Sequence, residues 1–492
     1  MDVTFSFDNT YSRLPGRFFA RVDPTPVSNP SLIAVNHELA QELQLDPAWL
    51  ASPEGIAVLA GNLVPDGAEP IAAAYAGHQF GHPVPQLGDG RAVLIGETVD
   101  RTGVRRDIQL KGSGRTPFSR GGDGRAALGP VIREYLVSEA MAALGIPTTR
   151  ALAAVVTGET VIRERPLPGA VLTRVASSHI RVGTFQYFAF RRDIDGVRTL
   201  ADYVIARHYP DAAGTGTPYR ALLDAVVARQ ADLVAQWLLV GFIHGVMNTD
   251  NMSVAGETID YGPCAFLDAY DPATVLSAID QLGRYAYGNQ PGIAHWNLTR
   301  LAETLVPLLA DETEAAIATA QEALAAFAPR FEAAFHAGLR RKLGLSSERE
   351  GDAALGQDLL DLMRDNQADY TLTFRNLGAA AGDPAGDRQV RDLFVDPTAY
   401  DPWSRRWRRR LAEDPQAAED RRTAMDSVNP KFIPRNHRIE AVIEAAVERG
   451  DLSPFAELRT VLSSPFDEQP HFEAYAAPPS EQQRVLQTFC GT

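Results

Sequence analysis

The sequence predicts an α+β protein of two lobes, in which a β-rich half precedes a helical half. Three observations lead to this fold class. The 492 residues are more than one compact core usually organises. Segments typical of strands gather between about residues 86 and 175, and segments with helical periodicity dominate after about residue 187. We therefore expect an N-terminal extension over 1–70, a β-rich lobe over 71–186, and a helical lobe with a C-terminal extension over 187–492.

The β-rich half is expected to contain four strands and a helix, after a Pro-rich start with one helix around 31–44. Strands are predicted over 92–100 and 105–112, on either side of the turn DRTG. A helix is predicted over about 130–144, because proline suits its first turn and Gly145 follows its end. Two further strands, ALAAVVTG and AVLTRVA, flank the loop RERPLPG.

The second half is dominated by segments with helical periodicity. These segments lie at 217–243, 311–343, 355–365 and 438–449. The segment 378–387 is rich in Gly, Pro and Asp and is predicted to be a surface loop. The basic segment WSRRWRRRL (403–411) fits the solvated face of an amphipathic helix better than a site for a phosphate or an acidic substrate.

Composition excludes several classes of protein. The formal charge is −15, from 47 Lys and Arg against 62 Asp and Glu, and such a surface repels a polyanion, so we expect no nucleic-acid partner. The start of the chain has no signal-peptide pattern, and the most apolar run, 233–243, is too short to span a bilayer. We expect a cytoplasmic protein with no membrane partner. The two cysteines, Cys264 and Cys490, exclude a disulfide framework and a multi-cysteine zinc site.

The first candidate site segment is PQLGDGRAVLIGE (85–97). Gly88 and Gly90 lie in a turn that feeds a strand, whereas the dinucleotide fingerprint and the P-loop both need a helix at that point. Glycines in a β-hairpin let backbone N–H groups approach a nucleotide, as in the glycine-rich loop of kinases. Arg91 could add a guanidinium for a phosphate. An ordinary hairpin turn is the alternative for this motif taken alone.

Lys111 ends the strand that follows this turn, where a kinase keeps its phosphate-binding lysine. The next loop is rich in glycine and contains Arg115, Arg120 and Arg125 around Asp123 and Gly124, which suits a polyphosphate better than a core. On the following helix, Glu134 shares the inward face with apolar residues. A buried carboxylate needs a partner, and Lys111 is the expected one. Glu139 is the alternative to Glu134.

The segment HGVMNTDNMS (244–253) has the spacing of a kinase catalytic loop with one replacement. That loop has a His, an Asp two residues later and an Asn seven residues after the His. Counted from His244, Asn251 matches the Asn, but Val246 stands where the catalytic Asp belongs, and Asp250 is the candidate base. Asp260 opens Asp-Tyr-Gly in place of the metal-binding Asp-Phe-Gly, so Asn251 and Asp260 offer hard oxygen ligands for Mg²⁺ or Mn²⁺. The order of these motifs predicts a bilobal protein-kinase-like fold.

Four segments together resemble the selenoprotein O family of protein adenylyltransferases. They are YAGHQFGHPVPQLGDGRA (75–92), QLKGSGRTPFSRGGDGRA (109–126), HGVMNTDNMS (244–253) and IDYGPCAFLD (259–268). The resemblance runs over nearly the whole chain. It implies a protein-kinase-like enzyme that transfers AMP from ATP to Ser, Thr or Tyr hydroxyls of proteins, itself included. It also implies that ATP binds flipped relative to a kinase, with the α-phosphorus facing the acceptor and the γ-phosphate buried by cations.

The resemblance also implies roles for individual residues. Glu134 would orient Lys111, Asp250 would be the catalytic base, and Asn251 and Asp260 would hold Mg²⁺ or Mn²⁺. The residues implied to bind ATP are Gly88, Gly90, Arg91, Lys111, Asp123, Gly124, Arg174, Arg181 and Asp260.

The resemblance bears on both cysteines as well. Family members carry Cys or Sec three residues from the C-terminus, as Cys490 does, and in some bacterial relatives it pairs with a cysteine after the Asp-aromatic-Gly segment. The candidate partner here is Cys264, for which a small buried apolar residue is the alternative interpretation.

Three other functions stay open beside AMP transfer. They are transfer of UMP with Mn²⁺, phosphoryl transfer by a kinase with a displaced base, and nucleotide binding without catalysis by a pseudokinase. Val246 argues against the kinase, because no carboxylate stands in the usual place of the base. The retained Lys111, Glu134, Asn251 and Asp260 argue against the non-catalytic scaffold.

Overall fold

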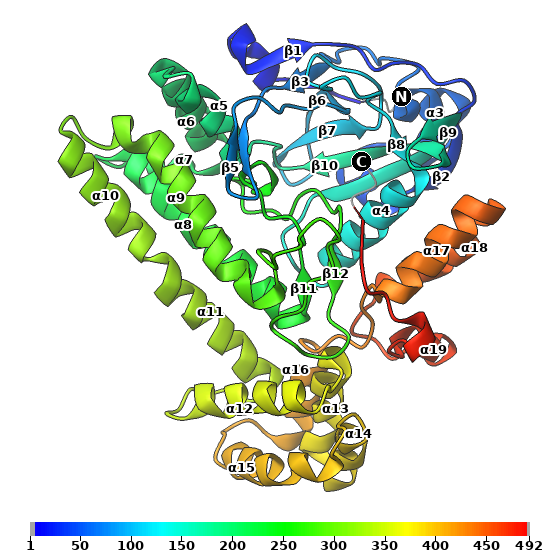
Figure 1. Cartoon of the computed structure of the whole chain (residues 1–492), viewed down its shortest axis with the longest axis vertical. Coiled ribbons are helices and arrows are strands. Elements are labelled where there is room, and N and C mark those ends of the chain that lie inside the picture. The colour runs from blue at the N-terminus through cyan, green and yellow to red at the C-terminus, as the bar shows by residue number, and fades with distance from the viewer. Residues whose placement is uncertain (1–4, 490–492) are drawn as a thin grey trace.

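A computed structural model describes residues 5–489, which form a mixed α/β structure compatible with the predicted α+β class. Its centre is an eight-stranded sheet with strand order β1-β3-β6-β7-β10-β9-β2, in which β8 pairs with β10 and neighbouring strands are antiparallel. Figure 1 shows the sheet at one end of the molecule and long helices extending away from it. The strands are β1 Phe19–Arg21, β2 Ser31–Val35, β3 Ile71–Ala73, β6 Ala92–Val99, β7 Arg105–Lys111, β8 Ala126–Ala127, β9 Arg150–Ile162 and β10 Pro166–Ala176.

The two faces of the sheet differ in character. One face packs its apolar side chains against the short helices α1 His37–Glu42, α2 Pro47–Leu50 and α3 Pro53–Ala60. Because side chains alternate along a strand, Ile108 and Leu110 of β7 enter this core while Gln109 and Lys111 point to the opposite face. Helix α4 Leu128–Ala143 covers part of that second face. The predicted strands at 92–100 and 105–112, the two that follow, and the helix near 130–144 are confirmed as β6, β7, β9, β10 and α4.

The helix predicted over 31–44 is wrong in its first half. Ser31–Val35 form β2, which pairs with β9 at the edge of the sheet. The helix α1 starts only at His37, where the side chain of Asn36 accepts a hydrogen bond from Leu39 N at 3.1 Å and caps the first turn. Residues of the segment 1–70 thus supply both edge strands of the sheet, β1 and β2.

The helical part follows the sheet in the chain. Helices α8 to α11 lie along one side of the molecule in Figure 1, α12 to α16 gather at the end far from the sheet, and α17 and α18 return to pack beside α4. The helices are α5 Val182–Phe190, α6 Ile194–His208, α7 Pro210–Ala213, α8 Pro218–Val240, α9 Gln290–Leu309, α10 Thr313–Ala325, α11 Phe327–Lys342, α12 Asp352–Asp365, α13 Tyr370–Gly382, α14 Asp387–Arg391, α15 Tyr400–Ala412, α16 Ala418–Asp426, α17 Asn436–Arg449, α18 Ser453–Leu462 and α19 Glu473–Ala476. Within residues 5–489, no helix has both the length and the apolar character needed to cross a bilayer.

Two predictions for this half have different outcomes. The surface loop predicted over 378–387 is wrong, because α13 runs to Gly382 and a 3-10 turn over Pro384–Gly386 leads directly into α14, which buries Val390. The amphipathic helix predicted at 403–411 is confirmed as α15. It buries Trp403 and Trp407, and its buried Arg410 pairs with Asp352, Nε to Oδ1 at 2.6 Å.

Two small two-stranded sheets lie outside the eight-stranded sheet. One is the hairpin of β4 Gly77–Gln79 and β5 His82–Val84, which precedes the turn of Gly88 and Gly90 (the glycine turn) in the chain. Strands β11 Phe242–Ile243 and β12 Ala265–Phe266 bracket the segment that carries Asp250 and Asp260. Both small sheets therefore fix loops that carry candidate site residues.

Candidate active site

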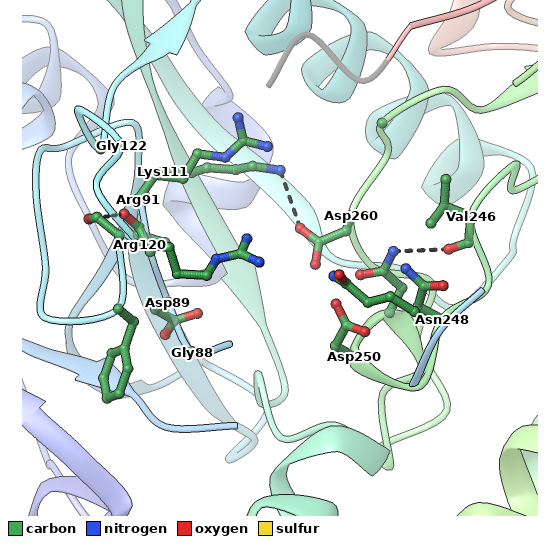
Figure 2. A pocket seen from close by; sticks show the side chains of 18 of the residues that line it. Gly88, Asp89, Arg91, Lys111, Arg120, Gly122, Val246, Asn248, Asp250 and Asp260 are labelled. Atoms are coloured by element: carbon green, nitrogen blue, oxygen red, sulfur yellow. Dashed lines mark hydrogen bonds and ion pairs between the residues drawn. The ribbon is translucent and has the colours of Figure 1, made fainter. Parts of the chain in front are cut away.

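A cavity of about 710 Å³ lies where the loops of the sheet meet the segments that follow α8. Figure 2 shows Arg91, Lys111 and Arg120 on one wall, directed toward Asp250 and Asp260 on the other. Of the residues to which the resemblance assigns a role, all but one line this cavity: Gly88, Gly90, Arg91, Lys111, Asp123, Gly124, Arg174, Arg181, Asp250, Asn251 and Asp260. The exception, Glu134, contacts Lys111 from α4. Of the three loop arginines, Arg120 and Arg125 line it and Arg115 does not. Folding thus gathers residues that are spread over more than a third of the chain.

The glycine turn closes tightly against the glycine-rich loop that follows β7. Gly88 has φ of +81°, and a Cβ there would lie 2.3 Å from the ring of Phe118. At Gly90 a Cβ would lie 2.8 Å from the carbonyl oxygen of Phe118. Ser119 and Thr116 donate their hydroxyl hydrogens to Gly90 O and Asp89 O. Glycine is therefore required in the turn because two loops share one narrow space.

Asp260 lies at the centre of a cluster of cations. Its Oδ1 is 3.2 Å from Lys111 Nζ and 2.5 Å from Arg174 Nη1, and its Oδ2 is 2.7 Å from Arg181 Nη1. Although burial opposes ionisation, these cations hold the pKa of Asp260 well below its usual range. The residue also has φ of +63°, which a non-glycine residue adopts only when its surroundings hold it there.

A second layer of contacts orients these cations. Lys111 Nζ donates to Glu134 Oε2, and Arg174 Nη1 lies 3.1 Å from Glu134 Oε1. Arg174 stands opposite Gln109 in the pairing of β10 with β7, and its Nε donates to Gln109 Oε1 at 3.1 Å. The alternative partner, Glu139, lies away from Lys111 and pairs with Arg150 Nη2 at 2.8 Å.

Asp250 is buried beside this cluster without a direct ion pair to it. Its Oδ1 has no hydrogen-bond partner, and a Cβ at Gly77 would lie 2.5 Å from that oxygen. Burial raises the pKa of Asp250 from 3.8 to about 6, although the nearby Arg181 guanidinium acts in the opposite direction. A buried carboxylate that lines a cavity and has a pKa close to neutrality is suited to accept a proton.

His244 and Val246 complete the segment. His244 is buried, and its Nε2 lies 2.9 Å from Ile259 O, which links the segment of Asp250 to that of Asp260. Val246 lines the cavity with an apolar side chain and cannot move a proton. Its carbonyl oxygen accepts a hydrogen bond from Asn251 Nδ2 at 2.9 Å (Figure 2), so the amide oxygen of Asn251 is the atom left for a ligand.

The oxygen atoms in the cavity fit Mg²⁺ or Mn²⁺ that binds together with phosphates. No group of three His, Cys, Asp or Glu side chains among residues 5–489 could hold a metal without help. Mg²⁺ in phosphate-transfer sites usually takes one or two carboxylates and completes its shell with phosphate oxygens and water. Asp260 and the amide oxygen of Asn251 are hard donors of this kind, and Asp250 lines the same cavity.

Several residues that line or support the cavity were missed by the sequence reasoning. The ring of Tyr75 lies 4.5 Å from the Arg181 guanidinium carbon, and Arg163 pairs with Asp123, Nη1 to Oδ2 at 2.8 Å. Asn248 and Gln109 also have structural roles that no motif indicated. For Gln109 a signal existed, since residues 107, 109 and 111 are polar and alternate with apolar ones along a strand.

Comparison with known proteins identifies the family of this chain. Residues 2–463 match the family model described as protein adenylyltransferase SelO. The chain belongs to the SelO family. A protein nucleotidyltransferase YdiU of Bradyrhizobium diazoefficiens is 68% identical over 492 residues, covering all of both chains. Proteins of the same name from Rhodopseudomonas palustris and Methylorubrum populi are each 66% identical, again over the full length of both chains.

Membership of the SelO family confirms two predictions from the sequence. The resemblance to selenoprotein O was correct, and the chain is an enzyme of the nucleotidyltransferase class, for which a nucleotide is the substrate. The cysteine pairing implied by the resemblance is not tested, because Cys490 lies outside the described residues. Cys264 is buried and lies two residues after the Asp-Tyr-Gly segment.

Proposed function

We propose that this SelO-family enzyme transfers AMP from ATP to Ser, Thr or Tyr hydroxyls of proteins, its own chain included. The distribution of charge across the cavity supports this best. Arg91 and Arg120 extend toward the cavity from the glycine-rich loops (Figure 2), and neither has an ion-pair partner among the described residues. Asp250 and Asp260 lie on the opposite wall. A triphosphate whose terminal phosphates are bound by Arg91 and Arg120 presents its α-phosphorus nearer to Asp250.

The proposed fold is protein-kinase-like, with lobes over 71–186 and 187–492 and an extension over 1–70. The sheet, the Lys111–Glu134 pair on β7 and α4, and the Asn251 and Asp260 pair between β11 and β12 follow one another in kinase order, which supports this assignment. ATP is proposed to bind flipped relative to a kinase, through the glycine turn, Asp123 and Gly124, and the cations of the cavity.

In the proposed mechanism, Asp250 accepts the proton of the acceptor hydroxyl and the hydroxyl oxygen attacks the α-phosphorus. The bond from the α-phosphorus to the bridging oxygen breaks, and pyrophosphate leaves. Lys111, Arg174 and Arg181, held by Glu134, Gln109 and Tyr75, offset the charge that develops on the phosphates. Mg²⁺ or Mn²⁺ held by Asn251 and Asp260 would supply further charge neutralisation.

The first prediction identifies which phosphate is transferred. Purified protein incubated with ATP and Mg²⁺ or Mn²⁺ is expected to acquire label from the α-phosphate and none from the γ-phosphate, because the carboxylate of a kinase base is replaced by Val246. Gel autoradiography with the two labelled nucleotides measures this directly. Label from the γ-phosphate alone would favour a kinase that transfers the γ-phosphate. No label from either nucleotide would favour the non-catalytic scaffold. A parallel reaction with α-labelled UTP and Mn²⁺ compares AMP with UMP transfer.

The second prediction concerns pH. A base works only when deprotonated, so kcat/KM for the acceptor is expected to fall about tenfold per pH unit below pH 6 and to level off above it, following the raised pKa of Asp250. ATP affinity should change much less over the same range, because Asp250 is proposed to act on the acceptor hydroxyl and not to bind the nucleotide. Rates from pH 5 to 8 with calorimetric ATP titrations test both statements. A rate that is flat across this range would contradict Asp250 as the base.

A further inference from the structure

The side of the cavity next to Asp250 is built from three segments that meet at Asn248. The side-chain oxygen of Asn248 accepts hydrogen bonds from Phe80 N at 2.9 Å and from the hydroxyl of Tyr285 at 2.7 Å. His78 N donates to Thr249 Oγ1 at 2.6 Å. The hairpin β4–β5, the segment of Asp250 and the loop 276–285 therefore form one connected wall, which we call the acceptor wall.

The loop 276–285 is held firmly in place. The buried carboxylate of Asp280 accepts hydrogen bonds from Arg284 N at 2.9 Å and from Tyr285 N at 2.7 Å. On its other side, Ala278 N donates to Thr488 O at 3.0 Å, and Thr488 N donates to Leu276 O at 2.6 Å. These contacts fix the loop at both ends, so the direction of its exposed side chains is set before any partner binds.

This fixed loop presents two apolar side chains to solvent, one of which lines the cavity. Ile279 lines the cavity and is 49% exposed, and Leu282 is 97% exposed. Single exposed apolar residues are common on protein surfaces and need no explanation. Here Ile279 and the partly buried ring of Phe80 line the same cavity as Asp250, and Leu282 follows Ile279 three residues later on the braced loop. We call Phe80, Ile279 and Leu282 the apolar edge.

A cation stands beside this apolar edge. The Arg284 guanidinium lies 4.9 Å from the Trp296 ring centroid and 5.7 Å from that of Tyr285. Within residues 5–489 it forms no ion pair, and its Nε is buried without a hydrogen-bond partner. The guanidinium also lies at the tip of the β4–β5 hairpin, where a Cβ on Gly81 would be 3.7 Å from its carbon. In a chain of net charge −15, an arginine without an ion pair at this position favours an acidic group on whatever binds there.

We propose that the acceptor wall docks an extended polypeptide segment around the acceptor hydroxyl, with an apolar side chain against Ile279 and Leu282 and an acidic one toward Arg284. The inference rests on the proposed function and names the class of acceptor that it uses. The nucleotide does not compete for this surface, because its phosphates are attracted to Arg91, Arg120 and Lys111 on the opposite wall. Phe80, Asn248 and Ile279 of the acceptor wall line the same cavity as Asp250, so a polypeptide bound on this wall can present its hydroxyl to Asp250.

The test uses nine-residue peptides with a central Tyr, Ser or Thr and with Ala, Leu, Asp or Lys at each flanking position. Transfer from α-labelled ATP is measured for the wild type, Leu282→Asp, Arg284→Glu and the control Val395→Asp, which changes a residue that is 76% exposed between α14 and α15. The wild type should favour Leu at one flank and Asp at another by roughly tenfold in kcat/KM, the usual value of one well-placed contact. Leu282→Asp should prefer Lys where the wild type prefers Leu, and Arg284→Glu should prefer Lys where the wild type prefers Asp. Both changes should appear mainly in the KM for the peptide. Val395→Asp should behave as the wild type, and all four proteins should bind ATP equally.

The outcomes separate the inference from the function on which it rests. No α-label on any protein or peptide would refute the proposed function itself. Label on the enzyme but on no peptide, or unchanged peptide preferences in Leu282→Asp and Arg284→Glu, would overturn the docking surface while AMP transfer stands. A second copy of the chain is the competing occupant. If sedimentation shows a wild-type dimer that Leu282→Asp dissociates, the apolar edge is a self-association surface and the docking inference fails.

Discussion

Replacing Asp260 with alanine is expected to lower AMP transfer by roughly 10³-fold or more, to the limit of detection. The carboxylate is proposed to hold the metal ion against the phosphates, and such charge neutralisation is worth several kcal/mol in a transition state. Asp260 is also the group through which Lys111, Arg174 and Arg181 are brought together. The variant therefore loses both the metal ligand and the arrangement of the cations. Initial rates with α-labelled ATP measure the effect.

The fold should survive this change, because each cation keeps another partner. Lys111 and Arg174 retain Glu134, and Arg181 Nη1 still donates to Asp250 O at 2.7 Å. Without metal, Asp260→Ala is expected to bind ATP at least as strongly as the wild type does, because Lys111, Arg174 and Arg181 then have one neighbouring carboxylate fewer. Asp224→Ala is the matched control, because its carboxylate pairs with Arg220 on the surface of α8. Normal turnover by Asp260→Ala, or undiminished turnover of the wild type in EDTA, would contradict the metal assignment.

The residues of the site that could be predicted from sequence are those that local patterns mark. Glycines in a turn, a lysine at a strand end and an acidic residue on an inward helix face each leave a signal within a few residues. Tyr75 and Arg163 leave none, because one acts by stacking on Arg181 and the other by pairing across loops with Asp123. Asn248 acts by joining two segments that lie far from it in the sequence. Their roles arise only when distant loops meet.

The errors in the fold have the same origin. The segment 31–35 was predicted to be helical with the residues that follow it, yet it is extended because β9 offers a free edge with which it pairs. The segment 378–387 has the composition of a loop, yet α13 continues into it because packing decides the outcome. A Cβ on Gly378 would lie 2.6 Å from Asp426 on α16, so glycine there serves close contact between helices. In both segments tertiary contacts override local propensity.

Replacing Asp250 with alanine is expected to lower transfer by roughly 10²- to 10⁴-fold while ATP affinity stays nearly unchanged. Asp250 is proposed to accept the proton of the acceptor, a step that ATP binding does not need. The alternative is that Asp250 only shapes the turn before Asn251, in which case metal and ATP binding should weaken together with transfer. Calorimetric titration with a nonhydrolysable ATP analogue, beside the transfer assay, separates the two. Retained catalysis by Asp250→Ala would refute the assignment of Asp250 as the base.

Stability gives an independent check on the same residue. In the folded protein the pKa of Asp250 is raised from 3.8 to about 6, so ionisation costs free energy of folding as pH rises through this window, and the cost is fully present above it. Asp250→Asn removes the buried charge and is expected to increase the free energy of unfolding at pH 8 by on the order of 1 to 3 kcal/mol, with little gain at pH 4. Denaturant unfolding at the two pH values measures this. If Asp250 only shaped the turn, its replacement would make the protein less stable. If Asp250 is a base that is kept at the expense of stability, its replacement makes the protein less active and more stable. A lower free energy of unfolding for Asp250→Asn at pH 8 would therefore favour the structural role and count against Asp250 as the base.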